Sequence, residues 1–70
     1  MEFETICERM LGKKVRITFV DGSTPISGRC VGYTPAIDNE PELAEIDLDT
    51  GVAGVCYGFL ENEIMKIEEL

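Results

Sequence analysis

Apolar and polar residues alternate over most of residues 14–20, with apolar side chains at Val15, Ile17 and Phe19 and polar ones at Arg16 and Thr18. This period of two predicts a β-strand with one buried face and one solvated face. The dipeptide Asp21-Gly22 follows directly and favours a tight turn, because glycine accepts positive φ and aspartate bonds its own backbone. We therefore expect an antiparallel second strand over residues 26–33.

Three more strands are expected in the second half of the chain. Residues 43–48 alternate apolar with acidic positions, which is typical of a half-buried strand. Residues 52–59 form an uncharged, largely apolar run, and residues 64–67 form a short last strand after a tight turn over residues 60–63. The prolines and the Asp-Asn pair between residues 33 and 41 predict a loop.

The first segment, residues 2–11, has a helical pattern. Its apolar residues fall on one helical face: Phe3, Ile6, Cys7, Met10 and Leu11. Gly12 is placed to end this helix, which is too short to be stable alone and must pack on the strands. The expected fold is therefore one mainly β domain over residues 1–70. It has a helix at about residues 2–11 and a five-stranded, strongly bent antiparallel SH3-like barrel at about residues 13–68.

Cysteine usage indicates a reducing compartment. Cys7, Cys30 and Cys56 are odd in number and widely spaced, and the chain has no histidine that could complete a zinc site. We expect all three to be small buried apolar side chains. The N-terminus is acidic rather than basic, and no apolar run approaches the ~20 residues that span a bilayer. The prediction is a cytoplasmic protein with no cofactor and no membrane partner.

The net charge of −8 is unevenly distributed. Residues 1–30 hold five basic and four acidic residues, whereas residues 31–70 hold ten acids and only Lys66 as a base. Such an acidic half repels polyphosphates, which disfavours broad nucleic-acid binding. One basic cluster can hold a phosphate or an acidic partner: Lys13, Lys14, Arg16 and Arg29. The same residues can equally form a solvated strand end or pair with the acidic half of the protein.

The candidate catalytic and metal-binding groups are few. Glu45, Asp47 and Asp49 can in principle bind a hard cation such as calcium, but their spacing is not that of an EF-hand, and a solvated acidic face is expected instead. The chain has no histidine, no nucleophile beside a base and no glycine-rich loop that opens a helix. We therefore predict that it is not an enzyme and that it has no catalytic residue and no metal site.

Residues 51–59 carry no charge. If they form an edge strand, they expose an apolar backbone ladder that soluble proteins normally protect with charge, proline or a partner strand. Here only a partner strand is available, so self-association is expected. The alternative is that Val55, Tyr57 and Phe59 line the interior of the barrel.

The sequence resembles the Sm-like (LSm) family over nearly its whole length. The matching features are the helix that ends at Gly12, residues 15–22, residues 28–33, Asp38-Asn39, Tyr57-Gly58 and residues 63–67. The resemblance implies a ring in which strand four of one subunit pairs with strand five of the next. It thereby implies an oligomer interface at Val55, Cys56, Tyr57, Phe59, Ile64 and Met65.

The resemblance also implies single-stranded RNA as a ligand at the centre of such a ring. By position, Asn39 resembles the family's base-contacting asparagine and Gly58 the glycine of its second motif, with Asp38 and Tyr57 beside them. The chain departs from the family in two ways: Asp38 and Asn39 are adjacent, and Tyr57 stands where the family has an arginine. Asp38-Asn39 can instead be an ordinary loop that bonds its own backbone, and Tyr57 can be a core or interface aromatic.

The sequence thus predicts a non-catalytic Sm-like module that forms a homo-oligomer through its strand edges and binds single-stranded RNA. The alternative is a protein-interaction or scaffolding module that uses the same SH3-like barrel without nucleic acid.

Overall fold

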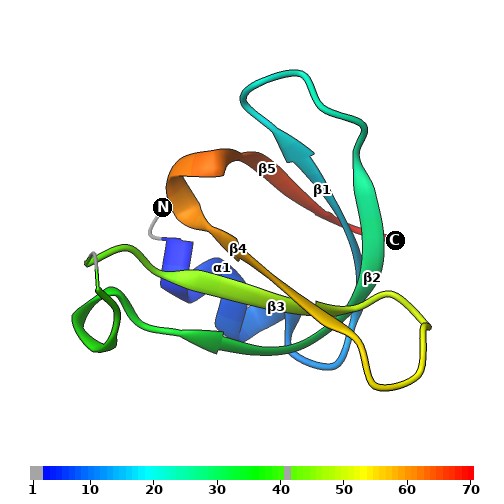
Figure 1. Cartoon of the computed structure of the whole chain (residues 1–70), viewed down its shortest axis with the longest axis horizontal. Helices are drawn as coiled ribbons and strands as arrows, with labels where there is room; N and C mark the ends of the chain where they lie inside the picture. Colours follow the sequence, from blue (N-terminus) through cyan, green and yellow to red (C-terminus); the bar gives the residue numbers. More distant parts are fainter. Residues whose placement is uncertain (1–2, 41) are drawn as a thin grey trace.

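The computed structural model describes residues 3–40 and 42–70. In this part of the chain the protein is mainly β, with one N-terminal α-helix and one five-stranded antiparallel sheet (Figure 1). The elements in chain order are α1 (Phe3–Met10), β1 (Lys14–Phe19), β2 (Ile26–Thr34), the 3₁₀ turn η1 (Ala36–Asp38), β3 (Glu45–Asp49), β4 (Cys56–Leu60), the 3₁₀ turn η2 (Glu61–Glu63) and β5 (Ile64–Glu69). No helix in this part of the chain is long and apolar enough to span a membrane.

The strand order in the sheet is β4-β3-β2-β1-β5. Register shifts between Thr18 and Phe19 and between Cys30 and Gly32 interrupt the ladders and help the sheet to bend. β4 and β5 are consecutive in the chain, joined by η2, yet they lie at opposite edges of the sheet. The sheet is therefore not closed, which corrects the expectation of a complete barrel.

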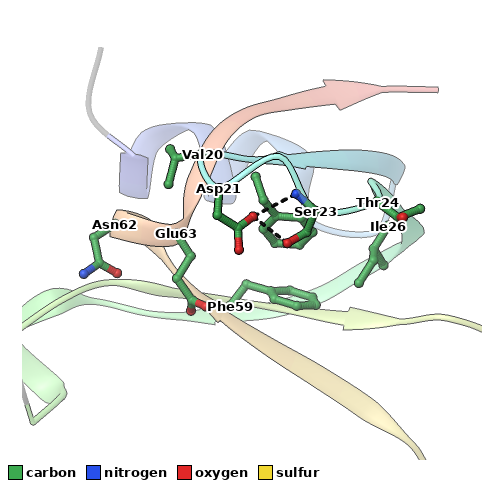
Figure 2. Close-up of a pocket in the computed structure, with 9 residues that line it drawn as sticks. Val20, Asp21, Ser23, Thr24, Ile26, Phe59, Asn62 and Glu63 are labelled. Carbon is green, nitrogen blue, oxygen red and sulfur yellow. Dashed lines mark hydrogen bonds between the residues drawn. The ribbon is translucent and has the colours of Figure 1, made fainter.

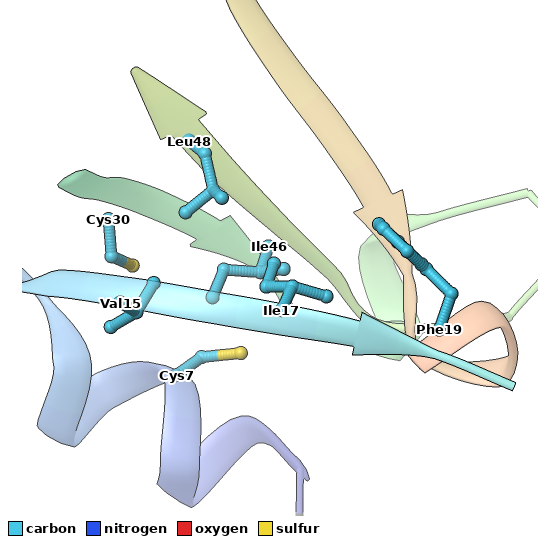
Figure 3. Close-up of a cluster of buried hydrophobic side chains, with 7 residues drawn as sticks. All are labelled: Cys7, Val15, Ile17, Phe19, Cys30, Ile46 and Leu48. Atoms are coloured by element: carbon cyan, nitrogen blue, oxygen red, sulfur yellow. The ribbon is translucent and has the colours of Figure 1, made fainter. Parts of the chain in front are cut away.

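The core lies between the concave side of the sheet and α1. Six side chains in it are fully buried: Cys7, Val15, Ile17, Cys30, Ile46 and Leu48. Figure 3 shows them together with Phe19, which is nearly buried. They come from α1, β1, β2 and β3, so the alternation in residues 14–20 and 43–48 correctly predicted which faces are buried. The two edge strands contribute only partly buried side chains to this core: Phe59, Ile64 and Ile67.

Two glycines are required by the backbone. Gly22 has φ of 80° in the loop between β1 and β2, a conformation that strains other residues. Gly28 lies where β2 crosses the end of β3, and a Cβ there would lie 2.7 Å from the carbonyl oxygen of Asp49. The close approach of these two strands therefore depends on the absence of a side chain at Gly28.

Several boundaries differ from the prediction. β3 begins at Glu45 instead of residue 43, and β5 extends to Glu69 instead of ending at residue 67. The largest difference is β4, which begins at Cys56, because residues 51–54 form bends and a turn with Gly51 and Gly54 at positive φ. The expected burial of all three cysteines is also wrong: Cys7 and Cys30 are buried, but Cys56 is exposed on the edge strand.

Candidate functional site

β4 is an exposed strand edge without a charged residue. It pairs with β3 alone, in the register that places Tyr57 opposite Leu48 and Gly58 opposite Asp47. Cys56, Tyr57 and Gly58 are all exposed, Tyr57 by 46%. The outer backbone groups of β4 therefore have no partner strand in the described part of the chain, and such a ladder is a template for pairing with another chain.

The inner face of β4 is aromatic. The ring of Phe59 lies 5.2 Å from that of Phe19, measured between centroids, and packs against the core. Tyr57 stacks on Phe59 at 6.4 Å with an interplanar angle of 23°, but nearly half of its surface is in solvent. The expectation that these residues line the interior is thus met by Phe59 and only partly by Tyr57. Val55, partly buried, precedes β4 rather than belonging to it.

β5 is the other free edge, and it is charged. Lys66, Glu68 and Glu69 lie on it, and Met65 is 60% exposed. The six residues expected at the oligomer interface are therefore divided between the two edges. Val55, Cys56, Tyr57 and Phe59 lie on or beside β4, and Ile64 and Met65 lie on β5. Phe59 and Ile64 both adjoin Phe19 and pack against the core of the protomer, whereas Cys56, Tyr57 and Met65 are exposed on the two edges.

The predicted basic cluster contacts the acidic end of the same chain. Lys13 Nζ lies 3.5 Å from Glu69 Oε1, and Arg16 Nε lies 3.8 Å from Glu68 Oε1. The Arg29 guanidinium donates a 2.6 Å hydrogen bond to the carbonyl of Gly12 at the end of α1. Lys14 is exposed opposite Arg29 in the β1–β2 ladder. Three of the four basic side chains are thus engaged within the protomer, which reduces the charge available for a phosphate.

Acidic side chains lie beside β4 on β3. A Cβ added to Gly58 would collide with the Glu45 carboxylate and would lie 3.2 Å from Asp47 Oδ1. Partial burial raises the pKa of Asp47 above its ordinary value by desolvation. In the described residues no three His, Cys, Asp or Glu side chains form a group that could hold a metal ion. Glu45 and Asp47 thus place two carboxyl groups next to the uncharged edge.

Asp38 and Asn39 lie in the loop that leads into β3. Asn39 Nδ2 donates a 2.8 Å hydrogen bond to the carbonyl of Leu43, and Asp38 is exposed at the end of η1. The Asn39 side chain thus bonds the backbone of its own loop, which is the arrangement expected if the loop does not contact a base. Tyr57 pairs with Leu48, three residues beyond the start of β3, so about 10 Å of strand separates it from the end of this loop. The structure therefore does not bring the four predicted RNA contacts into one cluster.

Two glutamates that the sequence analysis did not single out form hydrogen bonds between elements that are distant along the chain. Glu4 Oε2 accepts a hydrogen bond from the Ala36 amide at 3.1 Å, which ties α1 to η1. Glu61 Oε1 accepts from the Ala44 amide at 3.0 Å, and the Glu61 amide donates to the Ala44 carbonyl at 2.9 Å. This reciprocal pair anchors η2 to the start of β3. Neither contact has a signal in the sequence, because each joins residues that are distant along the chain.

Comparison with known proteins gives no match to a family model, a curated protein or a solved structure.

Proposed function

We propose that this protein is a non-catalytic binding module with an Sm-like fold that self-associates head to tail, β4 of one copy pairing with β5 of the next. The observation that carries the proposal is the uncharged, exposed edge of β4. Pairing with a second strand would satisfy the outer N–H and C=O groups of β4 and cover its apolar surface. β4 has five residues and β5 has six, so the two strands are similar in length and can pair along most of their residues.

Charge favours the head-to-tail arrangement over a symmetric one. If β4 paired with its own copy, Glu45 and Asp47 next to Gly58 would approach the same two acids of the second copy. Like charges that face each other destabilise an interface. If β5 paired with its own copy, Glu68 and Glu69 of both copies would be adjacent. A β4–β5 contact instead places the acids of β3 towards an edge that carries one base, Lys66, whose Nζ lies 3.7 Å from Glu68 Oε1. A repeated head-to-tail contact that closes produces a ring.

The test uses two variants, each with one blocked edge. Tyr57→Glu adds a negative charge to β4, and Met65→Glu adds one to β5. Each variant alone should lose the higher assembly, whereas an equimolar mixture should form a dimer, because one free β4 and one free β5 remain. Val31→Glu is the matched control, because Val31 is exposed on the central strand β2. Failure of the mixture to form a dimer would contradict the head-to-tail contact.

Single-stranded RNA is the second candidate ligand, and the exposed ring of Tyr57 favours it. A half-exposed aromatic that is stacked on Phe59 offers a platform for a base, and stacking on such platforms contributes about 1–3 kcal/mol per base. Titration of short uridine-rich and adenosine-rich RNAs at several salt concentrations tests this candidate. Binding that weakens steeply with salt would support it. No binding at low salt would leave a protein-interaction or scaffolding module without nucleic acid.

A further inference from the structure

A cleft of about 390 Å³ opens between the β1–β2 loop and the β4–η2 connection (Figure 2). It lies on the inner side of β4, where Phe59 adjoins Phe19 of β1, and not along the outer backbone of that strand. Its apolar floor is formed by Phe19, Ile26 and Phe59, with the two rings 5.2 Å apart and tilted by 56°. Its volume lies at the lower end of the range for ligand pockets, which suits one small group rather than a large molecule.

The charged residues that line this cleft are both carboxylates, Asp21 and Glu63. The other polar lining residues, Ser23, Thr24 and Asn62, are neutral. An aromatic floor beside two negative charges attracts a cation, because the ring faces and the carboxylates both favour positive charge.

Both carboxylates are positioned by their own loops. Asp21 Oδ1 accepts hydrogen bonds from the Ser23 hydroxyl and from the Ser23 amide, the latter at 2.9 Å (Figure 2). These bonds hold the pKa of Asp21 below its ordinary value. Glu63 Oε1 accepts a 3.0 Å hydrogen bond from the Leu60 amide. Hydrogen bonds to one oxygen of each carboxylate thus fix its orientation, which lowers the entropy cost of binding a ligand.

We propose that this cleft binds one lysine or arginine side chain of a partner protein. The methylene stem would lie on Phe19, Ile26 and Phe59, and the cationic head would lie between Asp21 and Glu63. Long basic side chains combine an apolar stem with a charged end, and the cleft presents the complementary surfaces in the same order. Because the cleft is open to solvent, the peptide backbone of the partner can remain outside. This site goes beyond the proposed assembly, which uses the outer edges of β4 and β5.

The test is an NMR titration of the ¹⁵N-labelled protein with capped single residues: Nα-acetyl-arginine methylamide, Nα-acetyl-lysine methylamide and the uncharged Nα-acetyl-norleucine methylamide. We expect saturable shifts at the Gly22, Ser23, Asn62 and Glu63 amides with the two cations, reduced at high salt. Equal binding of norleucine would overturn the role of the carboxylates. n-Pentylamine has the stem and the head of lysine without its backbone and should bind about as tightly as the capped lysine, whereas failure of n-pentylamine to bind would overturn the placement of stem and head in the cleft.

The variants Asp21→Asn and Glu63→Gln separate charge from fold. Each removes one negative charge but keeps the oxygen that accepts from Ser23 or Leu60. Each should weaken cation binding by about fivefold, and the double variant should abolish it. Glu8→Gln, an exposed acid on α1, makes the same charge change away from the cleft and should bind as the unmodified protein does. Unchanged binding by the double variant, with its spectrum still dispersed, would overturn the proposal.

Discussion

The two edge strands, β4 and β5, differ in charge. β5 carries Lys66, Glu68 and Glu69, and the last two lie near Arg16 and Lys13 of the same chain. β4 carries no charge, and Cys56, Tyr57 and Gly58 are exposed along it. Charged side chains on an edge discourage pairing with other chains, whereas an uncharged edge invites it. This difference is the basis for the proposal that β4 pairs with a strand of another copy.

Each edge strand lies beside a strand that has two fully buried side chains. β4 lies on β3, where Ile46 and Leu48 are fully buried, and β5 lies on β1, where Val15 and Ile17 are fully buried. The two edges therefore lie beside similarly buried strands and differ in their surface charge. The predictions below test this comparison, beginning with the largest expected effect.

Thiol reactivity should distinguish β4 from the core by orders of magnitude. Cys56 is exposed, whereas Cys7 and Cys30 are fully buried, and burial raises the pKa of Cys7 to about 12. In Tyr57→Glu, whose β4 edge is left unpaired, a thiol reagent at neutral pH should label Cys56 rapidly and the two others only after unfolding, since the thiolate is the reactive form. Mass spectrometry of the labelled protein before and after denaturation measures this contrast. Rapid labelling of all three native thiols would contradict the described core.

Truncation beneath each edge should cost the same stability. Ile46 faces Phe59 across β3–β4, and Ile17 faces Ile67 across β1–β5. Ile46→Ala and Ile17→Ala should each lower the free energy of unfolding by about 2–5 kcal/mol, because each leaves a cavity in a fully buried site. Urea unfolding gives the loss, and amide exchange should show faster opening of β4 in the first variant and of β5 in the second. A much smaller loss for one of them would show that its edge is less firmly attached.

A charge placed on β4 should abolish its pairing. Tyr57→Glu should raise the dissociation constant of the assembly by about tenfold or more, because the new carboxylate must be desolvated beside the apolar side chains of Leu48 and Phe59. Sedimentation over a concentration series measures the constant, with Val31→Glu as the control. An unchanged dissociation constant would contradict pairing through β4.

The smallest effect concerns the acid beside β4. Desolvation raises the pKa of Asp47 above its ordinary value of 3.8, so the unfolded chain loses this proton at a lower pH than the folded protein does. The ionised side chain therefore lowers stability once the pH rises through the folded pKa. Asp47→Asn should be slightly more stable at pH 7, and the gain should disappear as the pH falls towards 3.8. Urea unfolding at both pH values, with Asp49→Asn as the control, tests the sign.

The sequence predicted the parts of the fold that depend on local pattern. The alternation around Ile17 and Ile46 gave the buried faces of β1 and β3, and Asp21-Gly22 gave the reversal between β1 and β2. The start of β4 was missed because an uncharged run with several glycines has no alternation that marks where a strand begins.

The candidate sites depended more on tertiary contacts than on pattern. The free position of β4 follows from the strand order, which no local pattern contains. The pairing of Lys13 with Glu69 and the cleft between Asp21 and Glu63 join residues that are far apart in the chain. Sequence reasoning could identify these charges, but it could not place them together.

The solution mass of the unmodified protein tests the central claim most directly. Light scattering coupled to size exclusion should show a species several times larger than 7.8 kDa at micromolar concentration, and Tyr57→Glu should reduce it to the mass of one chain. If the unmodified protein stays at the mass of one chain at every concentration, the claim that β4 pairs with a partner strand is contradicted.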